Sequence, residues 1–393
     1  MPWKERDVMN LRTEFVLRSL REGINFRELC LEYSISPKTG YKWQKRFISD
    51  GISGLADRSR RPSRSPYQLP EDTICKLIRF KRAHPSWGPK KIRDLYARKY
   101  GKEPSESSVK RIFQKSGYVK TRKRRQAMVV HRIENRIESK QPNDVWTVDF
   151  KGWWRCQDNR RCEPLTVRDD FSKYVFVVLP LSSNNTENVK SVFERVFKQY
   201  GLPKMIRSDN GTPFAHPSSV LGLSRLSAWL ITLNIQLDRI QPGCPYQNGG
   251  HERMHRDIRL EVQGLVEGNF DHHRESLEIW RKEFNQVRPH EALQMKTPAE
   301  VYVKSERKYR GTPDRIEYPK HFLQRKVSPN GMIKIHDNQI FISTSLRGWN
   351  LGLEPVSESD LHVYFNYLLL GDIDLNTVAF TPINPILKNR KSE

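Results

Sequence analysis

Two stretches, VWTVDFKGWW at 145–154 and PLTVRDDFSKYVFVVLPL at 164–181, contain short runs of residues that favour β-strands. Such runs predict a meander of three strands. Residues 186–200 follow with helical spacing, and PKMIRSDNG at 203–211 returns as a short strand that ends in a turn. Because more helical segments come after it, the order of elements predicts a mixed α/β layer.

Three acids lie at distinctive places in this region. Asp149 interrupts an apolar strand, Asp209 ends the later strand, and Glu252 lies in the first turn of a helix that begins HERMHRDIRLE. An Asp inside an apolar strand is costly to bury without a partner. The three carboxylates could converge on Mg²⁺, which prefers oxygen ligands, and two such ions suit phosphodiester displacement. A simpler reading leaves Asp209 in an Asx-turn and Glu252 at a favourable helix end.

Positive charge is concentrated before this α/β region. The chain carries a formal charge of +24, and residues 1–140 hold 35 Lys plus Arg against 15 Asp plus Glu. Such asymmetry indicates a nucleic-acid partner for the front of the chain. The periodicity predicts helices at 7–21, 26–33 and 36–49, a helix-turn-helix pattern in residues 1–53 whose third helix begins at the N-cap Ser36. Its candidate DNA contacts are Lys38, Lys42, Lys45 and Arg46. A plain three-helix bundle with a solvated basic face is the alternative.

A basic linker and a second helical unit follow. Residues 54–70, GLADRSRRPSRSPYQLP, lack apolar periodicity and predict an extended segment. Helical patterns at 71–84, 89–100 and 105–115 predict a second trihelical DNA-binding unit over 71–125, and 126–140 would be a second basic linker. The candidate DNA contacts of these segments are Arg58, Arg60, Arg61, Arg64, Lys120, Arg122, Lys123, Arg124 and Arg125. For residues 54–70, a solvated linker without specific contacts is the alternative.

The remaining features narrow the class of protein. Residues 310–385 contain short alternating runs broken by Asn-Gly and Asp-Asn turns, which predict a small β-barrel. No run approaches the ~20 apolar residues of a membrane span. The N-terminal residues lack the apolar core of a secretory signal, so we expect a cytoplasmic, nucleoid-associated protein. The five cysteines contain no CxxC pair, which argues against a zinc site.

Four segments in order resemble a known family. WTVDFKG at 146–152, RSDNGTPF at 207–214 and PYQNGGHERMHRDIRLE at 245–261 are similar to the signature blocks of DDE transposases and retroviral-type integrases, and NQVRPHEALQMKTPAEVY at 285–302 resembles the segment that closes their catalytic domain. With the tandem helical units, the resemblance covers most of the chain and is nearest to transposases of bacterial insertion sequences. It implies an RNase H-like catalytic core over 141–305.

The resemblance also implies roles for individual residues. Asp149, Asp209 and Glu252 would be the catalytic acids and the ligands of two Mg²⁺ ions, with Mn²⁺ able to substitute. The resemblance and the helical spacing also indicate DNA contacts at Asn248, His255, Arg256 and Arg259. Arg259 falls seven residues after Glu252, almost two helical turns, so it shares a face with that acid.

One departure concerns the spacing of the acids. There are 42 residues between Asp209 and Glu252, more than is usual in this family. The surplus falls around HPSSVLGLSRLS at 216–227, and an insertion there leaves the acids together if it loops outward. Otherwise Glu261 becomes the poorer substitute for Glu252, since it lies deeper in the helix.

The sequence therefore predicts a DNA transposase. It would bind the terminal inverted repeats of its own mobile element, cleave 3′ ends in a metal-dependent reaction and join them to target DNA. Since two ends must be brought together, we expect a homo-oligomer on DNA, at least a dimer. The alternatives are an integrase of a retroviral-like or phage-like element and an inert site-specific DNA-binding regulator.

Overall fold

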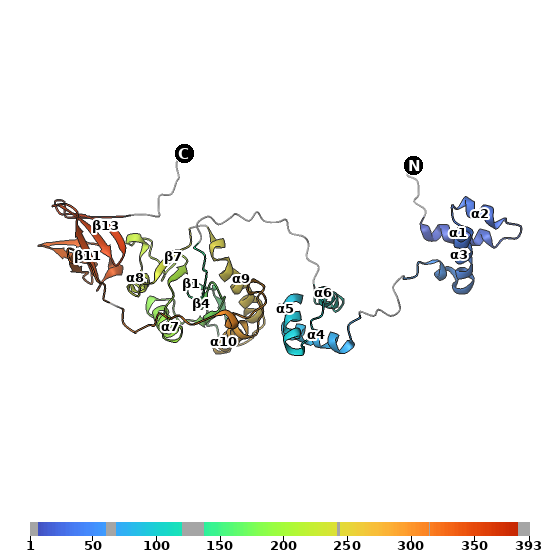
Figure 1. The fold of residues 1–393 in the computed structure, drawn as a ribbon, viewed down its shortest axis with the longest axis horizontal. Helices are drawn as coiled ribbons and strands as arrows, with labels where there is room; N and C mark the ends of the chain where they lie inside the picture. The colour runs from blue at the N-terminus through green and yellow to red at the C-terminus, as the bar shows by residue number, and fades with distance from the viewer. Residues whose placement is uncertain (1–6, 60–67, 120–136, 242–243, 314, 384–393) are drawn as a thin grey trace, which may run out of the picture. The chain divides into compact units, whose positions relative to one another are not determined.

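A computed structural model describes residues 7–59, 68–119, 137–241, 244–313 and 315–383 (Figure 1). The chain divides into two compact units, Met1–Pro70 and Glu71–Glu393. Several predicted DNA contacts lie outside the described residues: Arg60, Arg61, Arg64, Lys120, Arg122, Lys123, Arg124 and Arg125.

The first unit is the predicted bundle of three helices. Each helix begins at a side-chain cap; at the third, Ser36 Oγ accepts a hydrogen bond from the Thr39 amide at 3.2 Å. A Cβ at Gly40 would come within 2.8 Å of Cys30 Sγ, so only glycine lets the second and third helices approach this closely. The helices are α1 (Val8–Ser19), α2 (Phe26–Glu32) and α3 (Pro37–Asp50), followed by a 3₁₀ turn at Gly51–Leu55.

The second unit begins with another trihelical bundle. Its small core contains Trp87, which is 2% exposed, and Lys81 donates from Nζ to the Trp87 carbonyl at 2.8 Å. Ser105 caps the third helix by accepting from the Ser108 amide. The bounds are α4 (Glu71–Ala83), α5 (Pro89–Tyr100) and α6 (Glu106–Lys115), close to the predicted ones.

A five-stranded mixed sheet forms the centre of the second unit. Its strand order is β5-β4-β1-β6-β7, with antiparallel pairing in β5-β4-β1 and parallel pairing in β1-β6-β7. The predicted meander is thus confirmed, with a short hairpin, β2 (Trp154–Arg155) and β3 (Arg161–Cys162), inserted after its first strand. The sheet strands are β1 (Val145–Phe150), β4 (Pro164–Asp169), β5 (Val175–Pro180), β6 (Met205–Ser208) and β7 (Gln236–Arg239).

Helices cover both faces of this sheet (Figure 1). On one face, Trp146, Val148 and Val167 pack against α7 (Thr186–Tyr200) and α8 (Arg225–Thr232). The opposite face packs against α9 (Gly249–Ile258) and α10 (Phe270–Gln286). Because side chains alternate along a strand, Thr147 and Asp149 of β1 point toward the α9 side. A π-helical turn at Arg259–Gln263 extends α9, and α11 (Pro298–Val301) follows α10.

The C-terminal region is an open sheet with an added hairpin. Five antiparallel strands follow the order β14-β13-β12-β11-β8, and β9 and β10 pair separately. The predicted barrel is not confirmed, because no ladder joins the outer strands β14 and β8 among the described residues. The strands are β8 (Leu323–Lys326), β9 (Met332–Ile335), β10 (Asn338–Phe341), β11 (Asn350–Pro355), β12 (Asp360–Phe365), β13 (Leu368–Asp374) and β14 (Ala379–Pro382).

The surplus residues between Asp209 and Glu252 pack against this C-terminal sheet. Val220 and Leu223 are 7% and 2% exposed and share one hydrophobic core with buried residues of the C-terminal strands. Ser219 Oγ lies 2.8 Å from Ser343 Oγ. The insertion therefore joins the two sheets.

Candidate functional site

The parallel pairing of β1 and β6 brings two of the predicted acids to the same edge of the sheet. The register pairs Thr147 with Arg207, so Asp149 and Asp209 each lie two residues further along neighbouring strands. Asp209 follows the last residue of β6, and its Oδ1 accepts a hydrogen bond from the Gly211 amide at 3.2 Å. This is the predicted Asx-turn, and it leaves the other carboxylate oxygen available to a ligand.

Glu252 approaches the same edge from α9. It is exposed in the first turn of the helix. Burial raises the pKa of Asp149 to about 7, and the carboxylates of Asp209 and then Glu252 add to that increase. Like charges have this effect only over short distances. The structure therefore brings the three predicted acids into one electrostatic cluster.

The donor set of this cluster fits a divalent cation. Carboxylate oxygens are the ligands that Mg²⁺ prefers, and a cation between them would offset the repulsion that raises the pKa of Asp149. In the ranges that the structure describes, no three His, Cys, Asp or Glu side chains are already close enough to hold an ion. The fit rests on ligand chemistry and on the shared position of the three carboxylates.

Glu261, the substitute for Glu252, is engaged elsewhere. Its carboxylate accepts from Trp280 Nε1 at 2.6 Å and pairs with Arg288 at 2.9 Å. Of these two glutamates, only Glu252 contributes to the raised pKa of Asp149. The long interval between the second and third acids has therefore not displaced Glu252 from the cluster.

Two histidines of α9 face the sheet. His251 is fully buried, and the side chain of His255 is 14% exposed with its Nδ1 4.0 Å from Asp149 Oδ2. Both Nε2 atoms lie close to Thr166 Oγ1 on β4, at 2.9 Å and 2.8 Å. His255, predicted as a DNA contact, is thus turned mainly toward the sheet. Neither histidine's link to Thr166 was foreseen, since sequence spacing alone does not reveal a neighbouring strand.

Other predicted contacts differ in exposure. Arg256 and Arg259 are exposed, whereas Asn248 is 6% exposed. Sequence reasoning missed Lys151, whose Nζ donates to Gln263 Oε1 at 2.8 Å. Burial and then the charge of Arg259 lower the pKa of Lys151, so these two cations lie near each other. The sequence did offer one signal for Lys151, since it is a basic residue two positions after Asp149.

In the first unit, three of the predicted DNA contacts of α3 are exposed. Lys38, Lys42 and Lys45 are exposed, and Arg46 is half-buried with its guanidinium 5.1 Å from the ring centroid of Trp43. In the linker that follows, Arg58 forms an ion pair with Asp50.

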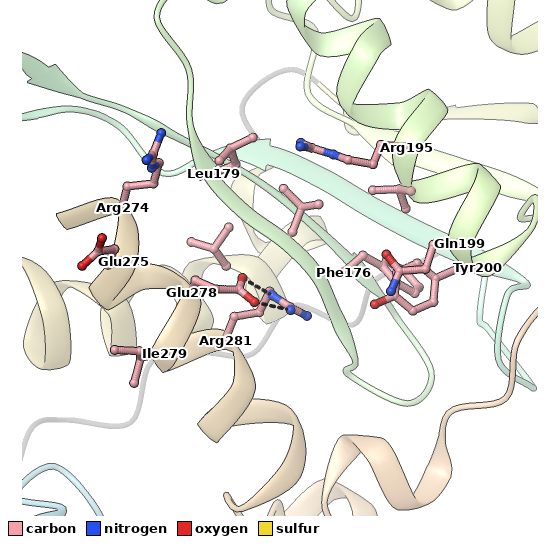
Figure 2. A pocket seen from close by; sticks show the side chains of 13 residues that line it. Phe176, Leu179, Arg195, Gln199, Tyr200, Arg274, Glu275, Glu278, Ile279 and Arg281 are labelled. Carbon is pink, nitrogen blue, oxygen red and sulfur yellow. Dashed lines mark hydrogen bonds and ion pairs between the residues drawn. The ribbon is translucent and has the colours of Figure 1, made fainter. Parts of the chain in front are cut away.

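A separate hollow lies at the edge strand β5. Side chains of β5, α7 and α10 line it, and Figure 2 shows the Glu278–Arg281 ion pair, at 2.6 Å, on its wall. The hollow contains none of the three acids, so the chemistry predicted from sequence does not lie there.

Comparison with known proteins agrees with this architecture. The description "Integrase core domain" matches residues 139–245 and 233–298, "Helix-turn-helix domain" matches 11–63, and "Homeodomain-like domain" matches 39–113. No helix among the described residues is long and apolar enough to cross a membrane.

Two relatives come from insertion elements. The chain is 28% identical over 248 residues to the insertion element IS407 uncharacterized 31.7 kDa protein of Burkholderia multivorans, covering 62% of this chain and 84% of that protein. It is 25% identical over 253 residues to the insertion element IS476 uncharacterized 39.2 kDa protein of Xanthomonas euvesicatoria, covering 63% and 70%. Together with the matched domains, these relatives identify the chain as a transposase of the retroviral integrase superfamily.

Solved structures give weaker matches. The HTLV-2 integrase catalytic core in complex with magnesium is 16% identical with a TM-score of 0.33, covering 42% of this chain and all of that one. The simian T-cell lymphotropic virus intasome in complex with a PP2A regulatory subunit gives 16% and 0.36, covering 75% and 97%.

Proposed function

We propose that the protein binds the terminal inverted repeats of its mobile element, cleaves their 3′ ends and transfers the freed strands into target DNA. The observation that supports this best is the position of Asp149 on β1, where the nearby carboxylates of Asp209, directly after β6, and Glu252, on α9, add to the burial that raises its pKa. Clustered carboxylates suit metal-dependent phosphodiester chemistry better than nucleophilic or acid–base catalysis by a single group.

In this proposal the three acids hold two divalent ions, Mg²⁺ with Mn²⁺ as a substitute. When bound, the ions would activate the attacking oxygen and stabilise the leaving oxygen of the phosphodiester. The chain's own groups would fix the geometry, since Asp149 lies on β1 and Asp209 directly follows β6, the strand paired with it. The cations of Lys151 and Arg259 would bind backbone phosphates beside the acids and orient the scissile bond.

We assign DNA recognition to the basic front of the chain. The proposed domains are residues 1–53 and 71–125 as helix-turn-helix readers, 54–70 and 126–140 as basic linkers, 141–305 as the catalytic core and 310–385 as a C-terminal domain for DNA or subunit contact. Exposed Lys38, Lys42 and Lys45 on α3 suit phosphate and base contacts in a groove. Because two element ends must be joined in one reaction, the working form would be at least a dimer on DNA.

The test is strand transfer with purified protein and labelled element ends in Mg²⁺ or EDTA. We expect metal-dependent joining by wild type, and loss of joining with retained end binding in Asp149→Asn and Glu252→Gln. Joining that survives Glu252→Gln contradicts the assignment of the third acid. End binding without joining in Mg²⁺ or Mn²⁺ would favour an inert DNA-binding regulator.

A further inference from the structure

Strand β4 holds α9 against the sheet through two buried polar side chains. Thr166 is fully buried and Arg168 is 4% exposed. Polar groups buried in this way cost free energy unless they are hydrogen-bonded. Arg168 Nη1 donates to the Gly250 carbonyl at 2.9 Å, and Thr166 meets the two histidines of α9. The helix of Glu252, α9, is therefore hydrogen-bonded to β4, a strand that carries none of the three acids.

The hydroxyl of Thr166 fixes the direction of three hydrogen bonds. Thr166 Oγ1 donates to the carbonyl of Asp149 at 2.8 Å. A hydroxyl has a single proton and two lone pairs, so it must accept from any further partners. His251 and His255, at 2.9 Å and 2.8 Å, must therefore both donate from Nε2. The contacts thus require the Nε2–H tautomer of each neutral histidine.

The Thr166 hydroxyl oxygen contacts the segments that carry two of the acids, Asp149 and Glu252. Asp149 lies directly opposite Thr166 in the β1–β4 register and is held through its backbone carbonyl. Glu252 follows His251 in the chain, so the helical turn that carries it is held through both histidines. The Nδ1 lone pair of His255 then faces Asp149 Oδ2 at 4.0 Å. One hydroxyl thus contacts both the strand of the first acid and the helix of the third.

We propose that Thr166 is a positioning residue that sets the separation of Asp149 and Glu252 and thereby the choice of divalent ion. The proposal rests on the function proposed above. Mg²⁺ demands near-ideal octahedral geometry with short bonds, so a loosened pair of carboxylates should lose Mg²⁺ first. Groups that orient metal ligands commonly matter about 10- to 100-fold in metal affinity or activity.

The test compares Thr166→Val, which removes the hydroxyl at nearly constant shape, with Thr166→Ser, which keeps it. Thr232→Val is the matched control, because Thr232 is 2% exposed and its hydroxyl donates to the Trp229 carbonyl within α8. Two readouts need no joining reaction. Nitrogen-15 NMR of the imidazoles reports the tautomers, and electron paramagnetic resonance of Mn²⁺ with Mg²⁺ competition reports ion binding on the protein–DNA complex.

We expect Thr166→Val to lose the Nε2–H tautomer preference, to bind Mg²⁺ about 10- to 100-fold more weakly and to join DNA far better in Mn²⁺ than in Mg²⁺. Thr166→Ser and Thr232→Val should behave like wild type. Equal loss with both ions, or failure of Thr166→Ser to restore Mg²⁺ binding, overturns the proposal. If wild type binds ions with these tautomers yet never joins DNA, the proposed function fails while the positioning role stands.

A second pair of variants decides the matter if Thr166→Val does not fold. His255→Gln keeps a donor near the place of Nε2, whereas His255→Leu removes it. We expect Mg²⁺ binding in the first variant and preferential loss of Mg²⁺ over Mn²⁺ in the second. Equal behaviour of the two variants overturns the link through Nε2.

Discussion

Gly250, near the start of α9, has no room for a larger side chain. A Cβ at this position would lie 2.2 Å from Arg168 Nη2, and that guanidinium is buried and bonded to the Gly250 carbonyl and to Asp170. The arginine therefore has little room to move aside. Glycine is required at this position because α9 and β4 approach each other closely there. The same contact holds the first turn of α9, which carries Glu252.

Gly250→Ala should therefore destabilise the protein despite the better helix propensity of alanine. We expect a loss of about 1–3 kcal/mol from overpacking, measured by urea unfolding, with impaired strand transfer. Gly249→Ala is the control, because a Cβ there meets nothing within 4 Å. Equal effects of the two substitutions would show that the Arg168 contact is not limiting.

The carboxyl of Asp149 makes a second residue-scale prediction, on pH. Its native pKa is about 7, above the value of about 3.9 in an unfolded chain. Between these values the native state binds more protons, so this group's contribution to the free energy of unfolding falls as pH rises from about 4 to about 7. Asp149→Asn removes the penalty.

In metal-free buffer, Asp149→Asn should gain stability relative to wild type between about pH 4 and about pH 8, on the order of 2–4 kcal/mol. Urea unfolding of both proteins across that range measures the gain. A constant difference between the two proteins over this range would contradict it. Added Mg²⁺ should stabilise wild type and not the variant, which separates the carboxylate cluster from other titrating groups.

At the scale of elements, local signals predicted helices well. Ser36 and Ser105 cap their helices from positions that are visible in sequence, and their acceptor bonds form within three residues. The closed barrel was not confirmed, because closure depends on pairing between distant strands, here β8 and β14, about which turn signals say nothing. The links of Thr166 to α9 span 85 and 89 residues and were equally invisible.

The insertion between the second and third acids should stabilise the C-terminal strands that it contacts. Leu223 is 2% exposed in a core shared with the C-terminal sheet, so Leu223→Ala should cost about 2–5 kcal/mol. Hydrogen exchange should speed up in β11 and β12 more than in β1 and β6. Ser218→Ala, at an exposed position of the same segment, is the control. Uniform acceleration in both sheets would mean that the insertion does not specifically support the C-terminal strands.

At the scale of the whole molecule, the chain divides into two units because each has its own hydrophobic core. The first unit has its own core around Phe15, Val16 and Trp43, and the catalytic sheet lies within the second unit. The charge of the sequence changes near residue 141, whereas the compact units divide after Pro70, so the second trihelical bundle lies in the same unit as the five-stranded sheet. Substitutions in the first bundle should therefore not disturb the acid cluster, which lies in the other unit.

A substitution on α3 tests whether end binding by the first unit is independent of the acid cluster in the second. Lys45 is exposed on the predicted recognition helix, so Lys45→Ala should weaken end binding and reduce the slope of log affinity against log salt by about one, as expected for one lost phosphate contact. The Mg²⁺ requirement for joining, measured at saturating protein, should not change, because the acids lie in the other unit. Lys198→Ala removes another exposed lysine, from α7, and serves as the control for net charge. An identical salt slope in the two variants would place the phosphate contacts elsewhere than α3, whereas an altered Mg²⁺ requirement would show that the two units act as one.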